Sequence, residues 1–226
     1  MRWLINLWWR LVRFGFRLLY NELAFTYDTV SKVVSLGAWR CWQRTTLHFL
    51  PAPDAGTVLE LAHGTGDLQI DLNNAQYQTI GFDLSPNMGR IAGRKLRKRG
   101  IDPYLVRGAG QALPFASGAF PAVVVTFPTN FIFDPRTLQE VHRLLQADGV
   151  LVVVLSGLFD GSGPVRAVLD WLYRITGQRS RDIDTEQVSL ISDEVIHRVE
   201  EHGYNARIEQ VNCPRSRAVL LVAQKK

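Results

Sequence analysis

The stretch VLELAHGTGDL, residues 58–68, constrains the fold more than any other part of the chain. It begins as an apolar strand, passes through a turn of small residues, and becomes helical in pattern after Asp67. In a doubly wound sheet, the first strand-to-helix turn lies beside the free N–H groups of the helix and is a usual place for a ligand. We therefore expect a doubly wound α/β fold with its ligand site at this turn.

Strands and helices alternate along most of the remaining chain. Apolar runs predict strands at 57–61, 79–83, 103–107, 122–127 and 150–156, and helical patterns predict helices at 67–75, 86–99, 135–146 and 192–202. Continuous Val and Leu strands between helices indicate a parallel sheet that is covered on both faces. About five residues separate the predicted strands 205–211 and 217–223, too few for a crossover helix, so this last pair should be antiparallel.

The composition fits one globular α/β domain of 226 residues, because 46% of the residues are apolar and 21% are charged. Two cysteines, Cys41 and Cys213, are too few for a disulfide framework, so a reducing compartment is the default expectation. The net charge of +5 is concentrated near the N-terminus and in the run 90–99. That run indicates contact with nucleic acid or an anionic membrane, and a solvated basic helix face explains it equally well.

Residues 1–20, MRWLINLWWRLVRFGFRLLY, predict an amphipathic helix over 1–21. The recurring arginines exclude a secretory signal core and would lie in hydrocarbon if the segment crossed a membrane. Spacings of three and four residues gather the polar positions into one narrow stripe, with apolar residues around the rest: Arg2, Asn6, Arg10, Arg13, Arg17 and Asn21. We expect this helix to lie in the interface of an anionic membrane, which makes the protein peripheral on the cytoplasmic side. Packing against the protein's own core or in a homodimer is the alternative.

The acid at the end of the second predicted strand favours a nucleoside ligand. Asp83 stands where doubly wound proteins carry a carboxylate for ribose hydroxyls. The turn reads A-x-G-x-G rather than the dinucleotide pattern G-x-G-x-x-G, and Asp67 follows it at the start of the helix. A carboxylate there would repel a pyrophosphate but would tolerate a sulfonium or an ammonium group. S-adenosylmethionine is therefore favoured over a dinucleotide.

Five stretches together resemble a known family: AFTYDTVSKVVSLGAWRCWQR (24–44), ELAHGTGDL (60–68), GFDLSPNM (81–88), GAGQALPF (108–115) and LQEVHRLLQADGVLVVV (138–154). The chain resembles class I S-adenosylmethionine-dependent methyltransferases and, among them, the ubiquinone/menaquinone-biosynthesis C-methyltransferase group, a methyltransferase type 11 domain. The resemblance covers about residues 20–160. It implies a Rossmann-like seven-stranded sheet with an antiparallel last strand, and S-adenosylmethionine as cofactor, in a domain that spans residues 22–226.

The resemblance also assigns residues to the parts of the cofactor, and it implies no metal. The residues it implies are Glu60, Ala62, Gly64, Thr65 and Gly66 for the methionine part, Asp83 and Leu84 for the ribose side, Ala109, Gly110 and Gln111 for the adenine, and Thr126 near the reacting methyl group. This chain departs from the pattern at three places: Ala109 replaces an Asp or Asn, Pro121 replaces an Asp, and Asn130-Phe131 stands where the quinone group has Arg-Asn.

Three side chains are candidates for the chemistry of methyl transfer. Tyr27, in the YD pair, would close over the cofactor, with a helix-packing tyrosine as the alternative. Asn130 would orient the acceptor, unless it only makes a loop hydrogen bond. His63 would act as a base beside the sulfonium, or its side chain would point away while its backbone lines the turn.

The combined pattern predicts a methyltransferase that acts at the membrane on a lipophilic small molecule, such as a quinol, isoprenoid, pigment or lipid. A helical cap over 22–50 and an insertion over 157–190, with a short helix at 165–175, would roof the acceptor pocket. A membrane-tethered scaffold protein that binds cofactor without turnover remains the alternative. A nucleic-acid methyltransferase is disfavoured, because TFPTNF (126–131) is not the Asn/Asp-Pro-Pro-aromatic motif of amino-group enzymes, so we expect no nucleic-acid partner.

Overall fold

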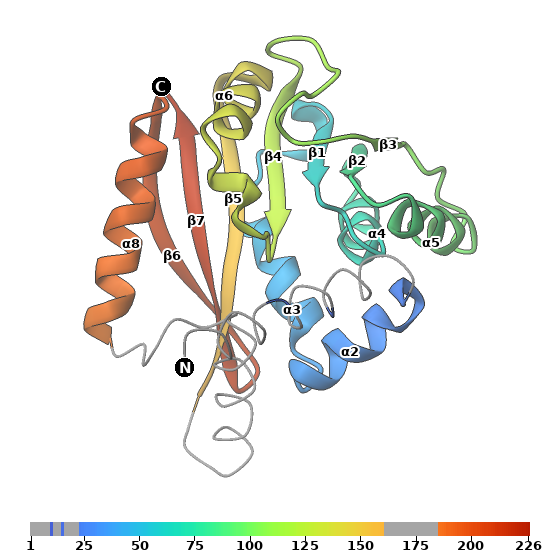
Figure 1. The fold of residues 1–226 in the computed structure, drawn as a ribbon. Coiled ribbons are helices and arrows are strands. Elements are labelled where there is room, and N and C mark those ends of the chain that lie inside the picture. Colours follow the sequence, from blue (N-terminus) through green and yellow to red (C-terminus); the bar gives the residue numbers. More distant parts are fainter. Residues whose placement is uncertain (1–9, 11–14, 16–22, 161–184) are drawn as a thin grey trace.

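The structure is a computed structural model that describes residues 10, 15, 23–160 and 185–226. Seven strands form one sheet in the order β3-β2-β1-β4-β5-β7-β6 (Figure 1). Their bounds are β1 Val58–Leu61, β2 Thr79–Asp83, β3 Leu105–Arg107, β4 Phe120–Thr126, β5 Leu145–Phe159, β6 Tyr204–Cys213 and β7 Ser216–Lys225. The first five strands are parallel, and β7 runs antiparallel to both β5 and β6. The predicted doubly wound sheet with its antiparallel ending is confirmed.

Helices cover both faces of this sheet. Their bounds are α2 Tyr27–Val34, α3 Trp39–Arg44, α4 Asp67–Asn74, α5 Pro86–Arg97, α6 Pro135–Leu144 and α8 Thr185–Glu200, with single 3-10 turns η1 Ala24–Thr26, η2 Thr45–Phe49, η3 Pro53–Ala55 and η4 Asn130–Phe133. Alternate strand residues face opposite sides. Leu59, Val123 and Val153 pack toward α6 and α8, whereas Val58, Val124 and Val152 pack toward α3 and α4. The unbroken apolar strands of the sequence follow from this burial on two sides.

The N-terminal helical segment, residues 24–49, is fastened to the sheet domain at several points. Arg40 of α3 pairs with the buried Asp71 of α4, through hydrogen bonds of 3.0 and 2.8 Å. The indole N–H of Trp42 donates to the Ser216 hydroxyl of β7 at 3.0 Å. These bonds hold α3 against the carboxyl end of the sheet, to which the β1 and β4 arrows point in Figure 1.

The two cysteines correct the sequence-based expectation, because the structure joins them in a disulfide. Cys41 lies on α3 and Cys213 ends β6, and their Cα atoms are 6.1 Å apart across a sequence separation of 172 residues. The bond ties the helical segment to the β6–β7 hairpin. A pairing that depends on the meeting of two distant elements cannot be read from cysteine number alone.

The insertion predicted at 157–190 is shorter than expected at both ends. Residues 157–159 continue β5 and pair with β7, and α8 begins at Thr185 rather than near 192. The predicted helix 165–175 lies outside the described residues, as does nearly all of the predicted amphipathic helix 1–21. Among the described parts of the chain, no helix is long and apolar enough to cross a bilayer.

Candidate cofactor and acceptor site

The site lies where the winding of the sheet reverses. From β1 the chain moves outward through β2 to β3, then returns to the other side of β1 as β4. The carboxyl ends of β1 and β4 therefore open a crevice between connections that leave in opposite directions. Glu60 of β1, Asp83 at the end of β2 and Thr126 at the end of β4 all lie along this edge.

The turn after β1 is wound tightly by left-handed backbone. Ala62, Gly64 and Gly66 have φ values of +55°, +53° and +84°. A side chain on Gly66 would meet Ala92 of α5, since a Cβ there would lie 2.9 Å from the Ala92 Cβ. Space is open around Gly64, where a Cβ would have no neighbour within 4 Å. The turn thus packs against α5 at Gly66 and leaves its backbone accessible at Gly64.

Asp83 is fixed by backbone N–H groups on both sides. One carboxylate oxygen accepts from the Gly64 N–H at 2.9 Å, and the other accepts from the Ser85 N–H at 2.8 Å. Each oxygen keeps a further acceptor position, because a carboxylate has about four. The next side chain, Leu84, is exposed and forms an apolar surface beside this carboxylate. This combination suits a ribose with an aromatic base next to it.

Glu60 is a buried carboxyl group with one unused oxygen. Its Oε2 accepts from the Gln69 amide at 2.6 Å, and Gln69 in turn accepts from the Thr79 hydroxyl at 2.7 Å. The Oε1 atom is buried and has no hydrogen-bond partner among the residues that the structure describes. Burial raises the pKa of Glu60 to about 8, with Asp83 adding to the effect and the Gln69 bond opposing it. A cationic donor at Oε1 would satisfy this atom and favour the charged form.

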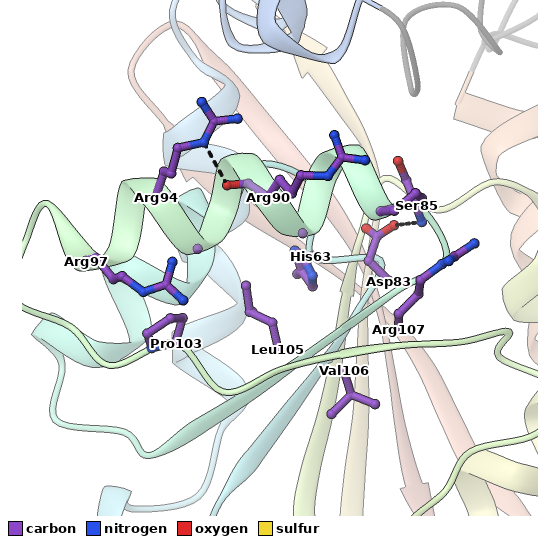
Figure 2. A pocket seen from close by; sticks show the side chains of 13 residues that line it. His63, Asp83, Ser85, Arg90, Arg94, Arg97, Pro103, Leu105, Val106 and Arg107 are labelled. Carbon is purple, nitrogen blue, oxygen red and sulfur yellow. Dashed lines mark hydrogen bonds between the residues drawn. The ribbon is translucent and has the colours of Figure 1, made fainter.

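His63 lies behind the turn, between α5 and β3. Figure 2 shows its ring beneath α5 and beside Leu105, at an open cavity of about 500 Å³ that residues of α5, β3 and the end of β2 line. The side chain is 4% exposed, and its Nδ1 lies 2.9 Å from the Gly64 carbonyl oxygen. Burial lowers the pKa of His63, and the nearby Asp83 charge opposes that effect. The lowered pKa favours the neutral imidazole, and Asp83 lines the same cavity as the ring.

The loop after β3 carries the residues predicted for the adenine. Ala109 and Gln111 are exposed, and Gly110 lies close to the Phe131 and Thr137 side chains, where a Cβ would come within 3.2 and 3.3 Å. Glu140 of α6 holds the loop by accepting from the Leu113 N–H at 2.8 Å. The loop is thus fixed beyond its exposed tip.

Thr126 faces a glutamine that the sequence analysis did not single out. The Gln43 amide of α3 donates to the Thr126 hydroxyl at 3.1 Å, and both side chains are buried. The Gln43 Oε1 atom has no hydrogen-bond partner among the described residues. Sequence alone gives no signal for this residue, because the contact joins α3 to β4 across 83 positions.

Four aromatic side chains next to Thr126 form what we call the aromatic wall: Tyr27, Trp39, Trp42 and Phe127. Phe127, in left-handed backbone with φ of +50°, stacks on Trp39 with ring centroids 4.0 Å apart. Trp42 lies against Phe127, and Tyr27 meets Trp39 edge to face at 6.3 Å. The wall joins the helical segment to the end of β4. Asn130 begins η4 on this same connection, and its side chain is outside the described set.

A charged cluster joins α2, the turn and α5. The Lys95 ammonium donates to Asp28 at 2.6 Å, to Asp67 at 2.9 Å and to the Thr65 hydroxyl at 3.2 Å. The Thr65 hydroxyl donates to the other Asp28 oxygen. Asp28, the sequence neighbour of Tyr27, therefore reaches the glycine turn. The YD pair marked this stretch in the sequence, but the contact of Asp28 with Thr65 and Lys95 depends on the fold.

The residues at the edge of the sheet fit S-adenosylmethionine on structural grounds. Glu60 presents an unsatisfied acceptor suited to an ammonium, Asp83 presents free acceptor positions suited to ribose hydroxyls, and Gly64 leaves open space between them. The parts of the chain that the structure describes contain no group of three His, Cys, Asp or Glu side chains that could hold a metal ion.

Comparisons with known proteins identify the family of the chain. The ubiE/COQ5 methyltransferase family matches residues 16–170. The chain is 32% identical over 164 residues to the demethylmenaquinone methyltransferase of Thermus thermophilus, which covers 71% of this chain and 72% of that protein. It is 29% identical over 145 residues to the ubiquinone/menaquinone biosynthesis C-methyltransferase UbiE of Geotalea uraniireducens. That match covers 60% of this chain and 60% of the relative. The second match thus spans about three-fifths of that relative's length.

Solved structures show the same fold at low sequence identity. A SAM-dependent methyltransferase of Thermotoga maritima superposes with a TM-score of 0.59 at 20% identity, covering 91% of this chain and 98% of that one. The geranyl diphosphate C-methyltransferase of Streptomyces coelicolor gives a TM-score of 0.58 at 15% identity, covering 81% and 77%. The chain therefore belongs to the ubiE/COQ5 methyltransferase family and is an S-adenosylmethionine-dependent methyltransferase.

Proposed function

We propose that this methyltransferase acts on a ring carbon of a lipophilic quinol at a membrane surface. The observation that carries the proposal is the family match over residues 16–170, together with relatives named for demethylmenaquinone and for ubiquinone/menaquinone C-methylation. The aromatic wall at the end of β4 supports a flat, apolar acceptor. Pigments, isoprenoids and lipids share the apolar character but are not in the names of these relatives.

We assign the positioning of the cofactor to backbone groups of the glycine turn and to two carboxylates. When bound, S-adenosylmethionine supplies an electrophilic methyl group on a sulfonium sulfur. Glu60 accepts from the ammonium through its unused oxygen, and Asp83 accepts from the ribose hydroxyls. The remaining cofactor contacts in this proposal are Ala62, Gly64, Thr65 and Gly66 along the methionine part, and Leu84, Ala109, Gly110 and Gln111 around the adenine.

On the acceptor side, the residues around Thr126 hold the ring for an in-line displacement. The ring carbon would receive the methyl group that the bound cofactor supplies and would lose its proton to water. The chain's contribution is orientation and exclusion of water. Tyr27 and the aromatic wall stack against the ring, while Thr126 and Asn130 orient it. His63 takes no proton in this proposal, since its ring lies behind the turn.

We place the reaction at the cytoplasmic face of a membrane. Residues 1–21 form the interfacial helix in this proposal, with residues 90–99 as a second contact for anionic lipid. Residues 22–50 cap the acceptor pocket, and the segment between β5 and α8 is the lid. Such an arrangement lets a quinol tail remain in the bilayer while its ring reaches Thr126.

The test is methyl transfer from isotopically labelled S-adenosylmethionine to demethylated quinols in phospholipid vesicles. Mass spectrometry should find a quinol heavier by one methyl group with the full chain. Asp83→Asn should weaken cofactor affinity by about tenfold or more, since a ribose contact to a charged acceptor contributes about 1.5–3 kcal/mol. Glu194→Gln, a matched change on exposed α8, should leave affinity and turnover as they are.

Two outcomes would redirect the assignment. Tight cofactor binding without turnover on any quinol would favour the scaffold alternative. The departures from the family pattern at Ala109 and Pro121 are compatible with that alternative. Labelled methyl on other extracted lipids but not on quinols would keep the enzyme class and replace the acceptor. A homodimer, which the amphipathic segment could also form, is tested by measuring the mass in solution.

A further inference from the structure

Exposed apolar side chains are concentrated on the N-terminal helical segment. Seven large apolar side chains are exposed among the described residues, and five of them belong to residues 23–36. Among these five, the most exposed are Phe25 at 72%, Val33 at 65% and Leu36 at 58%. We call these five side chains the apolar face: Leu23, Phe25, Val30, Val33 and Leu36. No other stretch of the described chain exposes its apolar residues in this way.

The polarity of α2 is inverted relative to a surface helix of a soluble domain. Val30, Val33 and Leu36 recur every three residues, so they lie on one side of the helix and its end. Ser31 and Ser35, on the inward side, are buried, and Asp28 also points inward to Lys95. A helix in water normally buries its apolar stripe and exposes its polar one. Here α2 cannot turn over without breaking the Asp28 contacts.

Leu36 adds to the evidence for the apolar face, because its backbone conformation is unfavourable for leucine. It has a φ of +48°, in the left-handed region that favours glycine and asparagine. Its side chain is exposed, so packing within the described domain does not account for the choice.

Unpaired cations flank the apolar face. Lys32 of α2 is exposed, as are Arg90 and Arg94 of α5, and none of the three pairs with a described carboxylate. Figure 2 shows the Arg90 and Arg94 side chains extending from α5 on the side away from the strands, and both residues also belong to the lining of the cavity at His63. The 3-10 turn η1, at the start of the apolar face, contacts α5, the helix that carries Arg90 and Arg94. Lys95, by contrast, is neutralised by Asp28 and Asp67.

We infer that the apolar face docks on an anionic bilayer, with Phe25, Val33 and Leu36 at the acyl boundary and the three cations at lipid phosphates. An apolar surface beside unpaired cations matches an interface where phosphates lie above hydrocarbon. The arginine- and tryptophan-containing residues 1–20 lead directly into this surface along the sequence. Because α2 lies across the carboxyl end of the sheet, docking turns the acceptor site toward the bilayer. The inference rests on the proposed function and specifies its membrane contact.

The test uses a double variant of the full chain that removes the face without harming the fold. In Val33→Gln/Leu36→Asn, glutamine suits an exposed helix position and asparagine suits the left-handed backbone, so Tm should stay level or rise. Co-sedimentation with vesicles of phosphatidylcholine and phosphatidylglycerol should fall by about tenfold or more, because two apolar anchors are lost. Tyr104→Ser, an equally exposed apolar side chain before β3, is the matched control and should partition as the wild type does.

A second variant tests the charges. Arg90→Gln/Arg94→Gln should weaken partitioning to vesicles that contain phosphatidylglycerol by several-fold, and less so at high salt. Partitioning to pure phosphatidylcholine should not change. Equal losses on both kinds of vesicle would contradict the role given to these arginines.

Other occupants of the face give different results, and each would overturn the inference. Unchanged partitioning of Val33→Gln/Leu36→Asn removes the docking role. If Val33→Gln/Leu36→Asn has a lower Tm than the wild type, the chain's own residues cover the face. If the variant has a smaller mass in solution than the wild type, a second copy covers it. Failure of the proposed function is seen separately, as absent methyl transfer to detergent-dispersed quinol by a wild type that still binds vesicles.

Discussion

Glu60 combines burial with an acceptor that the protein itself does not use. Its Oε2 accepts a hydrogen bond from Gln69, whereas Oε1 has no partner in the described part of the chain. Such an atom is costly in the folded protein alone and becomes favourable when a donor arrives. Its position at the end of β1 was predicted from the motif. Its protonation was not, because the pKa depends on neighbours from other strands.

Cofactor binding should therefore release a proton from Glu60. With a pKa of about 8 the group is mostly protonated at pH 7, and a bound ammonium would favour its ionised form. Calorimetry at pH 7 in buffers of different ionisation enthalpy should find close to one proton released by the wild type. Glu60→Gln should release close to none and bind more weakly. Equal proton release by both proteins would assign the proton to another group.

The same carboxyl group should shape the pH dependence of unfolding. Its folded pKa, about 8, lies above the 4.5 of the free group, so the folded state holds the extra proton between those values. The free energy of unfolding should fall as pH rises from about 4.5 to about 8. Thermal scans of Glu60→Gln should have a flatter profile over this window. A wild-type profile that rises there instead would contradict the assigned pKa.

His63 should matter for shape rather than for proton transfer. His63→Gln should lower cofactor affinity a few-fold, because the ring supports the turn at Gly64 and packs beside Leu105. The pH profile of kcat should keep its midpoints. A midpoint that vanishes in the variant would instead identify the imidazole as a titrating group of the reaction.

At the scale of elements, α6 holds the loop that follows β3. Arg143 donates to the Leu113 and Phe115 carbonyls at 3.0 and 2.8 Å, while Glu140 accepts from the Leu113 N–H and from Arg143. The pair thus bonds the loop through three of its backbone groups. The Arg143 contact lowers the pKa of Glu140 to about 2. Sequence periodicity predicted α6 but not this clamp, which depends on the path of the loop.

Replacing Glu140 should destabilise the protein in a pH-dependent way. The folded pKa lies below that of the free carboxyl group, so the stabilisation is present above about 4.5 and is lost as pH falls toward 2. At pH 7, Glu140→Gln should cost about 1 kcal/mol or less, since solvent screens this partly exposed pair. Thermal unfolding should show a smaller difference in stability between the wild type and Glu140→Gln at pH 3.5 than at pH 7. Glu194→Gln, in an exposed pair on α8, should cost less at both values.

Across the whole molecule, local patterns predicted more than long-range contacts did. The strand at Val58–Leu61 and the helix at Asp67–Asn74 were predicted because their periods and turn residues are adjacent in sequence. The contact of Gln43 with Thr126 and that of Asp28 with Lys95 were not, since each joins elements that meet only in the fold. The disulfide was missed for the same reason.

That disulfide should contribute to stability through the large loop it closes. Cross-linking a separation of 172 residues restricts the unfolded chain, and removing the bond should cost about 2–5 kcal/mol. Cys41→Ser/Cys213→Ser, or treatment with dithiothreitol, should lower Tm, with both treatments giving the same value. Identical unfolding with and without reductant would mean that the bond is absent in solution.

Lys95 connects the cofactor turn with the helix that carries the apolar face. One cation bonds α2 through Asp28 and the glycine turn through Thr65. Any shift of the turn on cofactor binding therefore changes how firmly α2 is held, and α2 carries the apolar face. Thermodynamic linkage is reciprocal, so whatever factor the cofactor adds to bilayer affinity, the bilayer adds to cofactor affinity. A factor above one would load the cofactor most readily at the bilayer that holds the proposed acceptor.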